Sequence, residues 1–125
     1  MANKALWVVL AGMMALGCAP VQESLIQGHW QGVTVLEEGA PLQVDPALIS
    51  ISFGSDNGYD YTSTLNYREA GTYYIDSKYL HTTDTLNQAS TEKAVEIVTL
   101  TADSLILKMN EGGRERLLKL ARVKE

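Results

Sequence analysis

Three residues of this chain have side chains that often carry chemistry in proteins: one cysteine, Cys18, and two histidines, His29 and His81. A catalytic histidine works beside a nucleophile and an acid, and a zinc site needs three or four suitably spaced ligands. Neither pattern is present, since the histidines are far apart and there is no second cysteine. We therefore expect no enzyme activity, no metal site and no cofactor, and we interpret both histidines as strand residues.

Cys18 follows an apolar segment with a short positive start. Lys4 precedes the apolar run Ala5–Leu16, which ends in the small residue Gly17. A membrane-spanning helix needs about 20 apolar residues, so this run is too short to be one. A charged start, a short apolar centre and a small residue at the end are typical of a secretory signal. The sequence predicts a signal peptide at residues 1–17.

The sequence Ala15-Leu16-Gly17-Cys18 resembles the lipobox of bacterial lipoproteins. The resemblance implies cleavage before Cys18, acylation of its thiol, and a short lipidated tether over residues 18–27. The alternative is an ordinary cleavage site that leaves a free thiol. A lone cysteine in an exported protein has no disulfide partner, whereas lipidation accounts for it and anchors the chain. Ala19, in place of the aspartate that retains lipoproteins in the inner membrane, favours the outer membrane, facing the periplasm.

The predicted mature chain has the size and charge of one small acidic domain. Residues 18–125 number 108, with nine basic and fifteen acidic side chains and a net charge of −6. This balance argues against nucleic acid as a partner. The expected partner is the membrane, through Cys18.

Residues 28–125 are expected to form an all-β domain. Stretches rich in β-branched, aromatic and leucine residues alternate with short runs of Gly, Asn, Asp and Ser, a pattern typical of antiparallel hairpins. A long connection, Glu37–Asp45, follows the first strand. The predicted strands are Trp30–Leu36, Leu48–Phe53, Tyr59–Leu65, Gly71–Asp76, Tyr79–Leu86, Lys93–Thr101, Ser104–Met109 and Arg114–Arg122.

The hairpin turns assign side chains to faces, because directly opposed residues point the same way. Turns at Ala102-Asp103 and Gly112-Gly113 predict an interior surface made of Val98, Leu100, Leu105, Leu107, Met109, Leu118 and Leu120. The outer surface is expected to carry Lys108, Glu115 and Lys119 beside an apolar strip of Val95, Ile97, Ile106 and Leu117. A turn at Asp76-Ser77 places Tyr73, Ile75 and Leu80 on one face, and Tyr74, Tyr79 and His81 on the other.

Two segments resemble the small bacterial lipocalin-like lipoproteins found in Bacteroidetes. Gly28-His29-Trp30 is similar to the G-x-W that opens their first strand, and Leu100–Leu107 is similar to a later hairpin. The resemblance implies an eight-stranded, antiparallel, up-and-down barrel. It also implies that Gly28, Trp30 and Arg122 close one end, with the arginine over the tryptophan. The Glu37–Asp45 loop would form a partial lid at the other end.

The same resemblance implies a small hydrophobic or amphipathic ligand inside the barrel. We expect Glu96 and Arg116 to point inward near the open end, either as a ligand-orienting pair or as a plain salt bridge. Met109, Tyr61 and Tyr73 complete the predicted ligand-binding set.

Two functions therefore remain open for the barrel. It could bind a small ligand, or it could be a filled scaffold that presents its outer strip or its loops to a protein partner in the cell envelope. A dry, connected interior space of about 300 Å³ or more would favour binding, and a filled interior would favour the scaffold.

Overall fold

The computed structural model describes residues 18–87 and 91–124 of the chain. The predicted signal peptide, residues 1–17, lies outside the described residues. In the described part, no helix is both long and apolar enough to cross a membrane.

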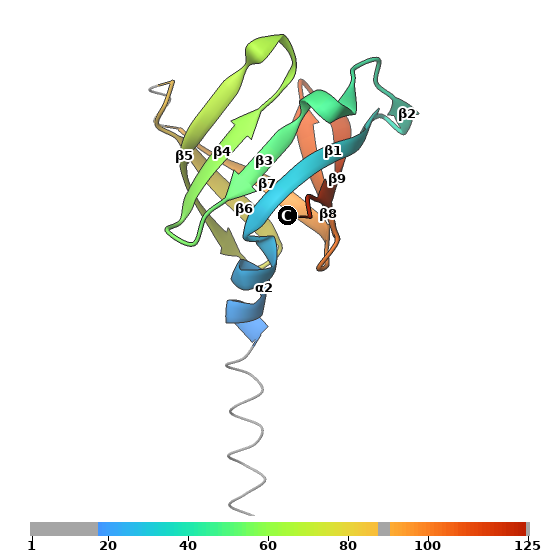
Figure 1. Ribbon diagram of the computed structural model, residues 1–125. Coiled ribbons are helices and arrows are strands. Elements are labelled where there is room, and N and C mark those ends of the chain that lie inside the picture. The colour runs from blue at the N-terminus through green and yellow to red at the C-terminus, as the bar shows by residue number, and fades with distance from the viewer. Residues whose placement is uncertain (1–17, 88–90, 125) are drawn as a thin grey trace, which may run out of the picture.

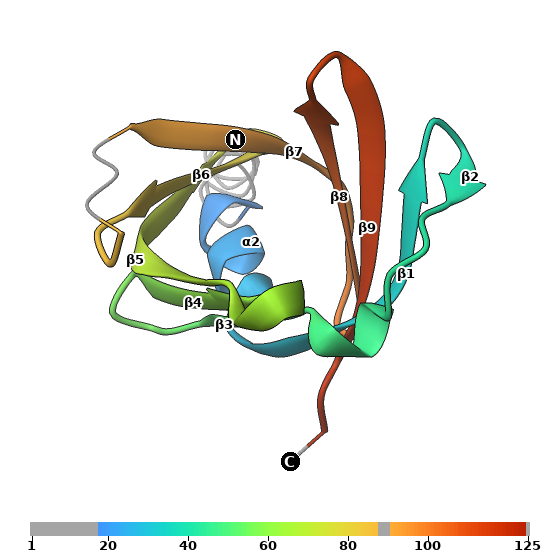
Figure 2. The same cartoon turned by 90° about the horizontal axis from the view of Figure 1, so that it is seen from above.

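Eight antiparallel strands close into a barrel, which confirms the predicted fold class (Figures 1 and 2). Each strand pairs with the next, and the last strand pairs with the first, so neither edge of the sheet is left open. The barrel strands are β1 (Gly28–Glu37), β3 (Ser50–Phe53), β4 (Gly58–Thr62), β5 (Arg68–Asp76), β6 (Tyr79–Asp84), β7 (Glu92–Leu100), β8 (Ser104–Glu111) and β9 (Arg114–Arg122).

Two of the predicted strands are shorter than expected because short 3-10 helices replace one of their ends. One helix spans Pro46–Leu48, before β3, where Pro46 has no amide to donate to a sheet. The other spans Thr64–Asn66, after β4. In it Leu65 and Asn66 have positive φ angles of 60° and 59°, a conformation that ends a strand.

The connection after β1 does not act as the predicted lid. It folds back on β1 through a two-residue strand, β2 (Ala40–Pro41), which pairs with Leu36 and Glu37. Figure 2 shows this hairpin outside the wall of the barrel and away from the lumen.

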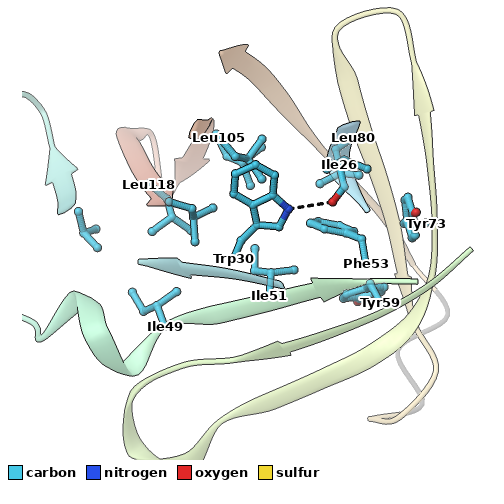
Figure 3. Packing of buried hydrophobic residues seen from close by; sticks show 13 residues of the cluster. Ile26, Trp30, Ile49, Ile51, Phe53, Tyr59, Tyr73, Leu80, Leu105 and Leu118 are labelled. Atoms are coloured by element: carbon cyan, nitrogen blue, oxygen red, sulfur yellow. Dashed lines mark hydrogen bonds between the residues drawn. The ribbon is translucent and has the colours of Figure 1, made fainter. Parts of the chain in front are cut away.

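The segment expected as a tether is helical and enters the core at its end. Helix α2 spans Cys18–Ile26 and covers one end of the barrel (Figure 1). Ile26 is fully buried, and its carbonyl accepts a hydrogen bond of 2.8 Å from the indole Nε1 of Trp30 (Figure 3). The segment before β1 is therefore attached to the core through Ile26.

Most of the predicted interior is confirmed by the strand register. Leu105 lies opposite Leu120 and Leu107 opposite Leu118, and all four are buried. The face assignment of the β5–β6 hairpin also holds, although its two-residue turn is Ser77-Lys78, one position later than expected.

A β-bulge in β7 reverses the prediction for the earlier half of that strand. Leu100 pairs with Leu105 as expected, but the register shifts between Ile97 and Thr99, and Val98 is the extra residue. Because one added residue inverts the alternation, Val98 is 48% exposed instead of interior. Val95 and Ile97, expected in the outer strip, pack against the core instead.

Candidate functional site

The predicted closure of the barrel is present at the end covered by α2. Trp30 pairs with Arg122 across β1 and β9, and the guanidinium carbon lies 4.3 Å from the centre of the indole ring. Arg122 also donates hydrogen bonds to the backbone carbonyls of Leu25, Gln27 and Ala102.

Gly28 leaves the space that Arg122 occupies. A Cβ at this position would lie 2.5 Å from the arginine Nη1, and its φ of +122° is one that side chains rarely adopt. Gly28, Trp30 and Arg122 therefore meet at one end, as predicted, and all their contacts there are structural.

A cavity of about 600 Å³ occupies the other part of the interior. Most of its wall is apolar or aromatic, with a few polar groups, which is the usual make-up of a small-molecule site. Its lining consists of Ile51, Phe53, Tyr59, Tyr61, Tyr67, Glu69, Leu80, Thr82, Lys93, Ala94, Val95, Leu107, Met109, Asn110, Glu111 and Leu118.

A buried carboxylate is the centre of the polar part of this cavity. Glu69 is only 8% exposed and lies on β5, directly opposite Tyr61 of β4. Its Oε1 accepts a hydrogen bond of 3.1 Å from the Tyr59 hydroxyl, and its Oε2 accepts one of 2.7 Å from the Tyr67 hydroxyl. The ammonium of Lys93 lies 3.1 Å from the same Oε2.

Both phenols that contact Glu69 have a raised pKa. The hydrogen bond to Glu69, together with partial burial, raises the pKa of Tyr67 to about 12. Burial first, and then the charge of Glu69, raises the pKa of Tyr59 further. Both hydroxyls therefore act as hydrogen-bond donors to Glu69, and each retains oxygen lone pairs that can accept a hydrogen bond.

Two of the predicted ligand-binding residues line the cavity and one does not. Tyr61 and Met109 are on the wall. Tyr73 is buried beside Phe53, with its ring edge-on at 4.9 Å between centroids, and its hydroxyl donates to the carbonyl of Gly54. Tyr73 is therefore a packing residue outside the cavity wall.

The predicted pair of Glu96 and Arg116 does not form, although Arg116 keeps its predicted inward face, opposite Met109. The bulge at Val98 puts Glu96 opposite Lys108, on the outer face of the sheet. Arg116 pairs instead with Glu37 at 2.8 Å, and this hydrogen bond is the main cause that lowers the pKa of Glu37. Neither Glu96 nor Arg116 lines the cavity.

Glu69 was missed because its segment was assigned to a connection between strands. The signal for it was present, since Glu69, Gly71 and Tyr73 are spaced by two residues and alternate residues of a strand share a face. Extending the strand back from Gly71 to Arg68, as β5 does, places Glu69 inside.

Both histidines lie outside the cavity wall. The Nδ1 of His29 lies 2.6 Å from the Ser52 hydroxyl, and the ring of His81 stacks on Tyr74 with centroids 4.6 Å apart. Across residues 18–87 and 91–124, no group of three or more His, Cys, Asp or Glu side chains is placed to hold a metal ion.

Comparison with known proteins relates the chain to lipocalin-like barrels by structure. A lipocalin-like protein from Bacteroides uniformis superposes with a TM-score of 0.59 at 13% sequence identity, over 78% of this chain and 98% of that one. An uncharacterised protein from Bacteroides eggerthii gives a TM-score of 0.57 at 16% identity, over 78% and 99%. No family model and no curated protein matches the sequence. The shared property is the fold, a closed eight-stranded lipocalin-like barrel.

Proposed function

We propose that this protein is a membrane-anchored binding module that takes a small amphipathic molecule into its barrel. The observation that carries the proposal is the 600 Å³ cavity, which combines a largely apolar wall with one buried carboxylate. Its volume is twice the roughly 300 Å³ at which an interior space favours ligand binding.

The filled-scaffold alternative loses two of its supports. The interior is not completely filled by its own side chains, since they leave a cavity of about 600 Å³ that is partly open to solvent. The apolar outer strip also loses Val95 and Ile97, which pack against the core. What remains on that face is Ile106 and Leu117, with Val98 added by the bulge.

Filling the cavity should abolish binding. In Met109→Trp, the indole would occupy space on the cavity wall, so the affinity for the neutral fluorescent probe N-phenyl-1-naphthylamine is expected to fall about tenfold or more. Fluorescence titration of protein carrying Cys18→Ser measures this directly.

Lys108→Trp is the matched control, because Lys108 is the chain neighbour of Met109 and lies on the outer face beside Glu115. It should leave probe affinity unchanged. Equal affinity of wild type and Met109→Trp would place the probe outside the lumen and refute the proposal. Native mass spectrometry of protein purified from its own host would identify the natural ligand.

The anchoring part of the proposal rests on the sequence around Cys18. We propose that Cys18 is acylated and holds the barrel to the outer membrane, on the periplasmic side. Cys18→Ser is then expected to move most of the protein from the membrane fraction to the soluble fraction, because the acyl chains are the main membrane contact. Immunoblots of the two fractions measure the change, and intact mass shows whether wild type carries the lipid. Wild-type protein of unmodified mass would rule out lipidation.

A further inference from the structure

The cavity wall carries more negative than positive side chains. Its ionisable acids and bases are Glu69, Glu111 and Lys93, so two carboxylates face one ammonium. Glu69 is the deepest of the three, at 8% exposure, whereas the Lys93 side chain is 57% exposed. A carboxylate held this far from water favours a cation beside it.

Three tyrosine side chains lie near this carboxylate. Tyr59 and Tyr67 donate to its two oxygens, and Tyr61 lies directly across the sheet from it. The rings of Tyr61 and Tyr67 meet edge to face, with centroids 6.3 Å apart. Aromatic rings attract ammonium groups through their faces, so these tyrosines add to the attraction of the carboxylate for a cation.

The cation beside Glu69 in this structure is the ammonium of Lys93, whose side chain is long and mostly exposed. Lys93 reaches Glu69 from the adjoining part of the wall, with its ammonium 3.1 Å from Oε2. Because the Lys93 side chain is 57% exposed, its ammonium can be hydrated again when it leaves Glu69. Glu69 would then be left buried with one charge partner missing, unless another ammonium took its place.

We propose that the cavity binds an amphiphile with an ammonium headgroup, which replaces the Lys93 ammonium beside Glu69 while its tail lies along the apolar wall. This inference rests on the proposed binding function and names its ligand class. An anionic headgroup is disfavoured because any group that reached Lys93 would also lie beside the Glu69 carboxylate. The apolar wall that would hold the tail includes Ile51, Leu80, Val95, Leu107 and Leu118.

Three probes with the same tail test the headgroup. Decylammonium, decanoate and 1-decanol, each below its aggregation concentration, are titrated into protein carrying Cys18→Ser by isothermal calorimetry. Decylammonium is expected to bind about tenfold more tightly than decanoate. A tenfold change in affinity corresponds to the free energy of about one hydrogen bond to a charged group.

Two substitutions should change this affinity in opposite directions. Glu69→Gln keeps the shape of the side chain but removes the charge, and is expected to weaken decylammonium binding about tenfold. Lys93→Gln removes the competing cation and is expected to strengthen it about threefold. The matched controls are Glu115→Gln and Lys108→Gln, which break an ion pair of 3.3 Å on the outer face and should change nothing.

Each outcome bears on a different part of the inference. Opposite effects of the two cavity variants, with unchanged controls, would support it. Equal or tighter binding of decanoate, or weaker decylammonium binding in Lys93→Gln, would overturn the ammonium class while leaving a ligand-binding barrel. Failure of all three probes to bind would overturn the proposed function as well. Circular dichroism of Glu69→Gln separates lost binding from lost folding.

Discussion

Replacing Trp30 with alanine is expected to lower the free energy of unfolding by about 3–5 kcal/mol, as for other large core truncations. The indole is fully buried, donates to the Ile26 carbonyl and lies under the Arg122 guanidinium. Its loss would open a cavity among buried side chains from both sides of the barrel (Figure 3). Urea unfolding followed by circular dichroism measures the change.

Tyr79→Ala serves as the control for this measurement. Tyr79 is also an aromatic strand residue, but it is 40% exposed on the outer face, so its truncation should cost much less. A Trp30→Ala protein within about 0.5 kcal/mol of wild type would contradict the role of this residue in closing the barrel.

Arg122→Ala is expected to lower the free energy of unfolding by about 2–4 kcal/mol. The substitution removes the cation–π contact with Trp30 and leaves three backbone carbonyls without their donor. Two of these carbonyls, Leu25 and Gln27, belong to the end of α2 and the residue after it. Hydrogen exchange should therefore show α2 losing protection before the strands do.

Arg114→Ala is the matched control, since Arg114 is a mostly exposed arginine at the other end of the same strand. Its exposed pair with Glu37, at 3.6 Å, should contribute at most a few tenths of a kcal/mol. If Arg122→Ala were as stable as Arg114→Ala, with unchanged protection of α2, the arginine would not be what holds the helix in place.

Most strands could be predicted from the sequence because hairpin geometry is local, whereas the closure of the barrel was expected from the family resemblance. Gly112-Gly113 is a two-residue turn, and both glycines adopt positive φ, so the register of β8 and β9 follows from the turn alone. Face parity along β9 then brings Arg122 to the same side as Leu118 and Leu120, and closure of the sheet brings it to Trp30.

The candidate site was less predictable because single-residue irregularities decide which side chains face inward. The bulge at Val98 has no turn residue to mark it, and it turned Glu96 outward and Val95 inward. This inversion separated Glu96 from Arg116, which stays on the inward face opposite Met109. Glu69 was missed for a related reason. The connection between β4 and β5 contains the 3-10 helix Thr64–Asn66, and the polar residues at the start of β5 gave no sign of a strand.

Helix α2 lies at the end of the barrel that Trp30 and Arg122 close (Figure 1). A flexible tether would let the barrel tumble beside the bilayer, but nine helical residues, about 13 Å long, join Cys18 to the fully buried Ile26. The cavity lies toward the opposite end, where its wall includes Asn110 and Glu111 near the β8–β9 turn. With lipid on Cys18, the barrel would stand on its closed end with its mouth toward the aqueous space. A ligand would then enter the cavity from the aqueous side, and not directly from the leaflet that holds the anchor.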